Sequence, residues 1–231
     1  MKHLRKALEK LRKIKRVSYH HLIHKIHRKH KLHKKTLFYI KEYGKHSNVP
    51  KTIIKESIKI LLLASIISSL GGLALEHIKG NLVAIIPLII LLPALNDMIG
   101  DYGSIVSGKF STMLYKGEVK NDVFKTLKLK KLFFQIIIIG LITAILSTIL
   151  ALFAAYFTNN QFSSLVILKV FFIAILDTLI LVSLLFFTAV FAGLYYFRKK
   201  EDPNNFLIPI TTAIADFGNM AILALLIVLI F

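Results

Sequence analysis

Uninterrupted apolar blocks of more than 20 residues dominate this chain of 231 residues after residue 55. An α-helix needs about 20 consecutive apolar residues to cross a hydrocarbon core of about 30 Å, and these blocks are long enough to do so. A water-soluble domain would instead carry its apolar residues at the period of a helix or a strand. The pattern predicts an all-α integral membrane protein built as a helical bundle.

The blocks predict five transmembrane helices, over residues 57–75, 82–114, 132–157, 170–197 and 206–231. The second would be about 50 Å long if fully helical, which exceeds the thickness of the hydrocarbon core. We therefore expect it to tilt, to kink at Pro93 or to project past the bilayer. The fourth is expected to follow an interfacial lead-in at Lys169.

The charges of the chain predict its orientation. Of the 31 Lys and Arg residues, 18 lie in the first 55 residues, and the segments 115–131 and 198–205 are also basic. Five spans put all three basic segments on the cytoplasmic side, as the positive-inside rule requires, and leave the C-terminus outside. A sixth span within 165–197 would move the 198–205 segment outside. We expect a multi-pass protein of the plasma membrane.

The basic segment 1–55 is expected to form a unit separate from the membrane domain 56–231. Its apolar residues recur at helical spacing, which predicts one or two amphipathic helices that end at Gly44 and the breaker cluster 47–50. Such helices bind anionic lipid headgroups. Metal sensing is an alternative, because five histidines share helical spacing: His20, His24, His27, His30 and His33. Nucleic-acid binding is a further alternative, but we expect no nucleic-acid partner.

Four aspartates fall within the predicted spans: Asp97, Asp101, Asp177 and Asp216. Each ionised carboxylate near the centre of a span costs about 2.5–3.5 kcal/mol on insertion-based scales. Such residues need water, hydrogen bonds or cations around them. The alternative to a functional role is that they hold helices together through hydrogen bonds or sit protonated.

The fifth span carries the first group of candidate ligands. Thr212, Asp216 and Asn219 follow the spacing i, i+4 and i+7, which puts oxygen-bearing side chains on one helix face. Pro209, upstream, weakens the local backbone hydrogen bonding and can free carbonyl oxygens. A hard divalent cation binds oxygen ligands of this kind and keeps several waters. The sequence therefore predicts a cation site at Asp216.

The second span carries the second group, Asn96, Asp97 and Asp101. Two carboxylates four residues apart share a face if the segment is helical. A row of small residues (Gly103, Ser107 and Ser111) is expected on the opposite face, packed against a neighbouring helix. Close helix packing alone is the simpler interpretation, but it leaves the paired acids unexplained.

Two segments resemble the membrane domain of the MgtE family of magnesium transporters and their eukaryotic solute-carrier relatives. They are PALNDMIGDYGSIVSGKFSTMLYKGEV (93–119) and EDPNNFLIPITTAIADFGNM (201–220). Gly100-Asp101 stands where that family has a Gly-Asn pair, and Lys109 stands where a basic residue is usual. The resemblance implies that Asp216 holds Mg²⁺ in a pore and that two copies form a homodimer around it. The family's bacterial members carry an acidic cytoplasmic gate, whereas this chain has its basic segment.

We therefore expect divalent cation transport, with Mg²⁺ as the main cargo and Co²⁺, Ni²⁺ or Zn²⁺ as further candidates, and no enzymatic activity. Asp216 would form the central site. Asp97, Asp101 and Asn96 would attract and dehydrate the ion, and Asp177 would support the polar network. Three alternatives stay open: exchange of Mg²⁺ or transition-metal cations against Na⁺ or H⁺, a membrane scaffold without transport, and transport of an anionic solute, which the acidic spans would repel.

Overall fold

A computed structural model describes residues 2–13, 19–32, 37, 49–119, 123–158, 162–199 and 202–231. Throughout these ranges the secondary structure is helical. Two short helices come first, α1 (Lys2–Lys13) and α2 (Tyr19–His30). The membrane part follows, as α4 (Val49–His77), α5 (Lys79–Ala84), α6 (Ile86–Lys116), the 3₁₀ turn η2 (Val123–Lys125), α7 (Leu127–Tyr156), α8 (Ser164–Arg198) and α9 (Pro203–Ile230). Within the described residues, five helices are long and apolar enough to cross a membrane: α4, α6, α7, α8 and α9. The predicted all-α membrane bundle with five spans is confirmed.

The boundaries of the spans differ from the prediction, and the third begins at Leu127 instead of residue 132. The starts of the second and fourth spans have local causes. The helix is interrupted at Ile85, so residues 82–84 belong to the short helix α5 and the second span begins at Ile86. Pro93 lies within α6 and does not end it. The fourth span begins before Lys169, because the Ser163 hydroxyl accepts a hydrogen bond from the Val166 N–H and caps the helix. Lys169 is thus part of α8, and its ammonium lies 4.6 Å from the centre of the Phe231 ring.

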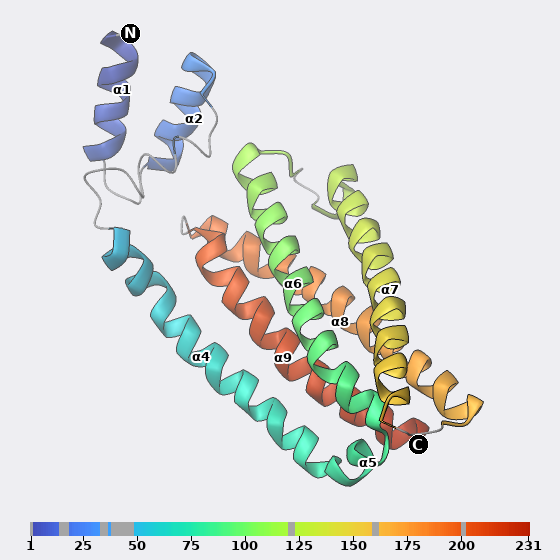
Figure 1. The fold of residues 1–231 in the computed structure, drawn as a ribbon. Helices are drawn as coiled ribbons and strands as arrows, with labels where there is room; N and C mark the ends of the chain where they lie inside the picture. Colours follow the sequence, from blue (N-terminus) through green and yellow to red (C-terminus); the bar gives the residue numbers. More distant parts are fainter. Residues whose placement is uncertain are drawn as a thin grey trace.

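The long helices run alternately up and down, and the chain ends at the opposite side of the bundle from its start (Figure 1). The C-terminal ends of α6 and α8 and the N-terminal ends of α4, α7 and α9 meet at one side, which we call the basic end. It carries the loops between α6 and α7 and between α8 and α9. The three basic segments of the sequence therefore share one side, as five spans require.

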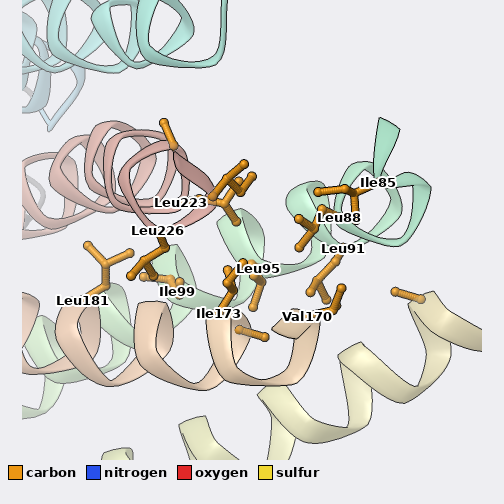
Figure 2. Close-up of a cluster of buried hydrophobic side chains, with 14 of the residues drawn as sticks. Ile85, Leu88, Leu91, Leu95, Ile99, Val170, Ile173, Leu181, Leu223 and Leu226 are labelled. Atoms are coloured by element: carbon orange, nitrogen blue, oxygen red, sulfur yellow. The ribbon is translucent and has the colours of Figure 1, made fainter. Parts of the chain in front are cut away.

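The helices α6, α8 and α9 form the centre of the bundle, where each packs against the other two. Their facing residues form an apolar core away from the basic end, with Leu95, Ile173 and Leu223 fully buried (Figure 2). A second core joins α6, α7 and α8 nearer the basic end around Phe110, Val182 and Phe186. These two cores fix the position of α6 against α9, and the candidate site lies between those two helices.

Helix α4 packs along α9 and, in the described part of the chain, makes no extensive contact with α6, α7 or α8. A Cβ added at Gly71 would lie 2.8 Å from the Met220 sulfur and 3.2 Å from the Phe217 Cα, so a glycine allows this close approach. Most of the apolar surface of α4 is exposed, including Leu62, Ile66 and Leu73. The first span thus contacts the bundle chiefly through α9.

The N-terminal helices α1 and α2 pack together, as their amphipathic pattern predicts. Their buried residues, Leu11, Ile23 and Ile26, form one cluster with Tyr115 at the end of α6. The Tyr115 hydroxyl donates to Asp202 Oδ1 over 3.3 Å, and the same oxygen accepts the Asn204 N–H that begins α9. The basic segment therefore contacts the end of the bundle from which α9 starts. The predicted helix end at Gly44 lies outside the described residues.

Candidate cation site

A pocket of about 300 Å³ lies between α6 and α9. Helix α6 presents residues about one turn apart along this pocket, and α9 presents two residues four apart, as the helical period requires. The lining residues are Pro93, Asn96, Asp97, Gly100, Asp101, Ser104, Thr212 and Asp216. The structure therefore brings together five of the seven predicted site residues, from two spans that are separated by more than 100 positions in sequence.

Both carboxylate oxygens of Asp216 accept hydrogen bonds. Asn96 Nδ2 on α6 donates to Oδ1 over 2.9 Å, and Ser68 Oγ on α4 donates to Oδ2 over 2.9 Å. Each oxygen keeps a further lone pair, because a carboxylate has about four acceptor sites. Asp216 is half-buried and lines the pocket, so its negative charge remains available to a ligand there.

Asn219 and Asp177 lie behind the pocket, where both side chains are fully buried. They are outside the pocket lining. When the Asn219 amide is oriented to donate, its nitrogen lies 2.8 Å from Asp177 Oδ2, so α8 and α9 are joined by this bond. Asn96 lies beside Asn219 and also bonds to Asp216. Asn219 therefore does not share the pocket face of α9 with Thr212 and Asp216, contrary to the prediction. The supporting role of Asp177 stays a prediction.

The two faces of α6 differ as predicted. Asp97 and Asp101 are exposed on the pocket side. Gly103 faces the bundle, where an added Cβ would lie 3.0 Å from the Thr211 Cβ, and Ser107 Oγ lies 3.2 Å from Thr211 Oγ1. The small-residue row therefore packs against α9, while the acids face the pocket.

Sequence reasoning missed Ser68. It lies in an apolar span next to Ser69 and close to Ser65, and no pattern separates these three serines. Ser69 bonds to its own helix, through the Ser65 carbonyl, whereas Ser68 reaches Asp216. Only the packing of α4 against α9 selects Ser68.

The proposed histidine metal sensor finds no support in the described residues. Within them, no three side chains of His, Asp or Glu lie close enough to hold a metal ion together, and this includes Asp97, Asp101 and Asp216. His27 Nδ1 instead hydrogen-bonds the Leu32 carbonyl over 2.6 Å. His33 and the side chain of His20 lie outside the described residues.

The pocket continues toward the basic end. A second pocket of about 720 Å³ shares Ser104 with the first and lies among three helices. It is lined by Gly108 and Thr112 on α6, Leu132 and Gln135 on α7, and Ile208 and Asn204 on α9. We call the two together the α6–α9 groove. It extends from the middle of α6 to the basic end, with carboxylates in its first part and lysines in its second.

A bundle of membrane-spanning helices with a carboxylate-lined groove between two of them defines a multi-pass membrane protein suited to handling cations. Comparison with known families agrees with this class. Residues 92–226, more than half of the chain, match the family model MgtE, described as divalent cation transporter. The chain belongs to the MgtE family, which indicates divalent cation transport and not enzymatic activity. No curated protein and no solved structure matches the chain.

Proposed function

We propose that this protein carries Mg²⁺ across the membrane along the α6–α9 groove, with Asp216 as the central ligand. The observation that carries the proposal is that Asp97, Asp101 and Asp216 line one pocket of about 300 Å³. Their three carboxylates give it a formal charge of −3, and because they are too far apart to bind one ion together directly, retained waters would bridge the ion to them. A dication attracted to this site offsets the cost of holding acids within a span.

The size of the pocket suits a partly hydrated ion. Mg²⁺ demands near-octahedral oxygen coordination and gives up its waters reluctantly, so it is usually held by one or two carboxylates together with several waters. A water occupies about 30 Å³ in the liquid, so about 300 Å³ accommodates the ion with several waters. Asn96 on α6 and Thr212 on α9 supply neutral polar groups to the same pocket. The carboxylate-rich lining favours Mg²⁺ over softer metals, with Co²⁺, Ni²⁺ and Zn²⁺ as competitors.

The exposure of Asp97 and Asp101 supports a homodimer. Asp101 lies midway along α6, about 22 Å from either helix end at 1.5 Å per residue. A carboxylate exposed to lipid there would cost about 2.5–3.5 kcal/mol, and there are two. A second copy placed face to face would cover the acidic pocket with its own acidic pocket and enclose an acid-lined, water-filled path, while the second pocket would stay open at the basic end.

We place the basic end in the cytoplasm of a cell whose plasma membrane holds the protein, because the positive-inside rule favours that orientation. The N-terminal helices would then rest on anionic headgroups. An inside-negative potential drives a dication inward by roughly 4.6 kcal/mol per 100 mV. Inward flow therefore needs no chemical fuel. Exchange against Na⁺ or H⁺ would use the same residues, and a scaffold would move no ion.

Purified protein in liposomes tests this function. We expect Mg²⁺ uptake that rises with an inside-negative potential and is inhibited by Co²⁺, Ni²⁺ or Zn²⁺ in a competition series. Uptake that requires an opposed Na⁺ or H⁺ gradient would instead identify an exchanger. If the protein is inserted and folded but moves no divalent cation under any gradient, the proposal is wrong and the scaffold alternative gains.

A cysteine introduced into the groove tests the dimer. The chain contains no cysteine, so Ile105→Cys would supply a single thiol on the exposed wall of the groove. We expect it to form disulfide-linked dimers in native membranes under mild oxidation. Phe172→Cys, on an exposed face of α8, is the matched control and should stay monomeric on a denaturing gel. Equal cross-linking of both variants would count against this interface.

A further inference from the structure

The second pocket of the α6–α9 groove has a charge opposite to that of the first. Lys109, Lys116 and Lys128 line it together with one acid, Glu118, which leaves a formal charge of +2. Lys128 Nζ lies 2.9 Å from Glu118 Oε1. Among the described residues, Lys109 makes no ion pair. A cation that follows the groove to the basic end would therefore pass the net positive charge of the second pocket.

Neutral hydrogen-bonding groups accompany these lysines. Asn204 lines the pocket, and its Oδ1 is buried without a hydrogen-bond partner in the described structure. Ser104 and Gln135 add an alcohol and an amide to the lining. The Asn204 oxygen is an acceptor, so it would pair with a hydroxyl or ammonium group of an occupant and not with a phosphate oxygen. The groups of this lining that can donate to a phosphate are the lysine ammonium groups, Ser104 and Gln135.

The outer part of the pocket lies at the level expected for lipid headgroups, and Lys109 lies about 10 Å deeper along α6. Lys116 is the last residue of α6, Lys128 the second residue of α7, and Asn204 the second residue of α9. Helix α6 finishes at the basic end, and α7 and α9 begin there (Figure 1). Basic pockets between transmembrane helices on the cytoplasmic side bind anionic phospholipid headgroups.

We propose that the pocket lined by Lys109, Lys116, Lys128 and Asn204 binds a phosphate group, supplied by the headgroup of an anionic phospholipid. The phosphate would neutralise the lysines beside the cation path. A dication that leaves the acidic pocket toward the basic end would then be repelled less by these lysines. Phosphate binding at this pocket does not depend on the proposed function. The reduced repulsion of the dication rests on the proposed Mg²⁺ transport.

Native mass spectrometry of the full chain tests binding without any transport assay. The protein in neutral detergent is titrated with short-chain phosphatidylglycerol, with phosphatidylcholine and with inorganic phosphate. The test variant is Lys109→Gln with Lys128→Gln. The matched control, Lys59→Gln with Lys131→Gln, removes the same charge from exposed lysines outside the pocket. Because the basic N-terminal segment also binds anionic lipid, the comparison is between the two variants, not with a neutral protein.

We expect phosphatidylglycerol to bind the wild type and the control alike, and the test variant at least about tenfold more weakly, while phosphatidylcholine does not discriminate. If inorganic phosphate alone shows this dependence on Lys109 and Lys128, the pocket is a phosphate site whose source is soluble. If the test variant and the control bind phosphatidylglycerol and phosphate equally, the proposal is overturned. If the wild type binds phosphatidylglycerol in this way but carries no Mg²⁺ in the liposome assay, the proposed function is wrong and the phosphate site remains.

Discussion

Asp216→Asn is expected to reduce Mg²⁺ uptake into proteoliposomes to the background of empty vesicles. The substitution removes one of the three carboxylates of the pocket and the one that α6 and α4 both orient. At about 4 Å and an effective dielectric of about 20, a carboxylate attracts a dication by about 8 kcal/mol before the ion's desolvation is counted. The amide offers only a dipole in exchange, so a hydrated dication gains too little at that position to be retained.

The fold is expected to survive this change. An asparagine at 216 keeps an oxygen to accept from Asn96, and its amide nitrogen can donate to the Ser68 hydroxyl, which is both donor and acceptor. Removal of a charge from a span also lowers the cost of insertion. Ser68→Ala is the control, because it deletes one hydrogen bond and retains the charge, and we expect measurable uptake. Normal uptake by a correctly inserted Asp216→Asn protein would remove Asp216 from the central role.

The features that periodicity and charge determine could be predicted from the sequence. The number of spans follows from the length of the apolar blocks. The two faces of α6 follow from the 3.6-residue period, which puts Asp97 and Asp101 together and turns Gly103 toward α9. The grouping of Thr212 with Asp216 has the same origin. Each of these features depends only on the geometry within one helix, and residue spacing in the sequence determines that geometry.

Relations between helices could not be predicted in the same way. Asn219 lies on the same helix as Asp216 but about five-sixths of a turn further on, and packing of α9 against α6 and α8 buries it behind the pocket. Ser68 contributes only because Gly71 lets α4 approach α9 closely. Both of these features depend on contacts between residues distant in sequence. The break at Ile85 has a local cause that hydropathy alone does not show, because Pro87 in the first turn of α6 has no N–H to continue the preceding helix.

The second prediction uses glycine substitutions to distinguish residues that line the groove from residues that pack in the core. A Cβ added at Gly100 would meet no atom within 4 Å outside its own stretch of helix, although Gly100 lines the cation pocket. Gly100→Val therefore directs its side chain into the pocket and displaces the water that a hydrated ion would carry. We expect Mg²⁺ uptake to fall at least about tenfold, the effect of a barrier increase of about 1.4 kcal/mol. The melting temperature in detergent should not fall, because valine exceeds glycine in helix propensity and the space around the added Cβ is open.

Two controls make this result specific, because they separate blockage of the pocket from damage to the fold. Gly72→Val places the same side chain on the exposed face of α4, where an added Cβ also meets nothing within 4 Å, and it should change neither uptake nor stability. Gly193→Ala adds a Cβ 2.8 Å from the buried Phe110 ring and 3.1 Å from Leu207, so overpacking should cost about 1–3 kcal/mol of stability. If Gly100→Val instead behaves like Gly193→Ala and loses stability in proportion to uptake, Gly100 is a packing residue. If it conducts like Gly72→Val, the ion does not pass through this pocket.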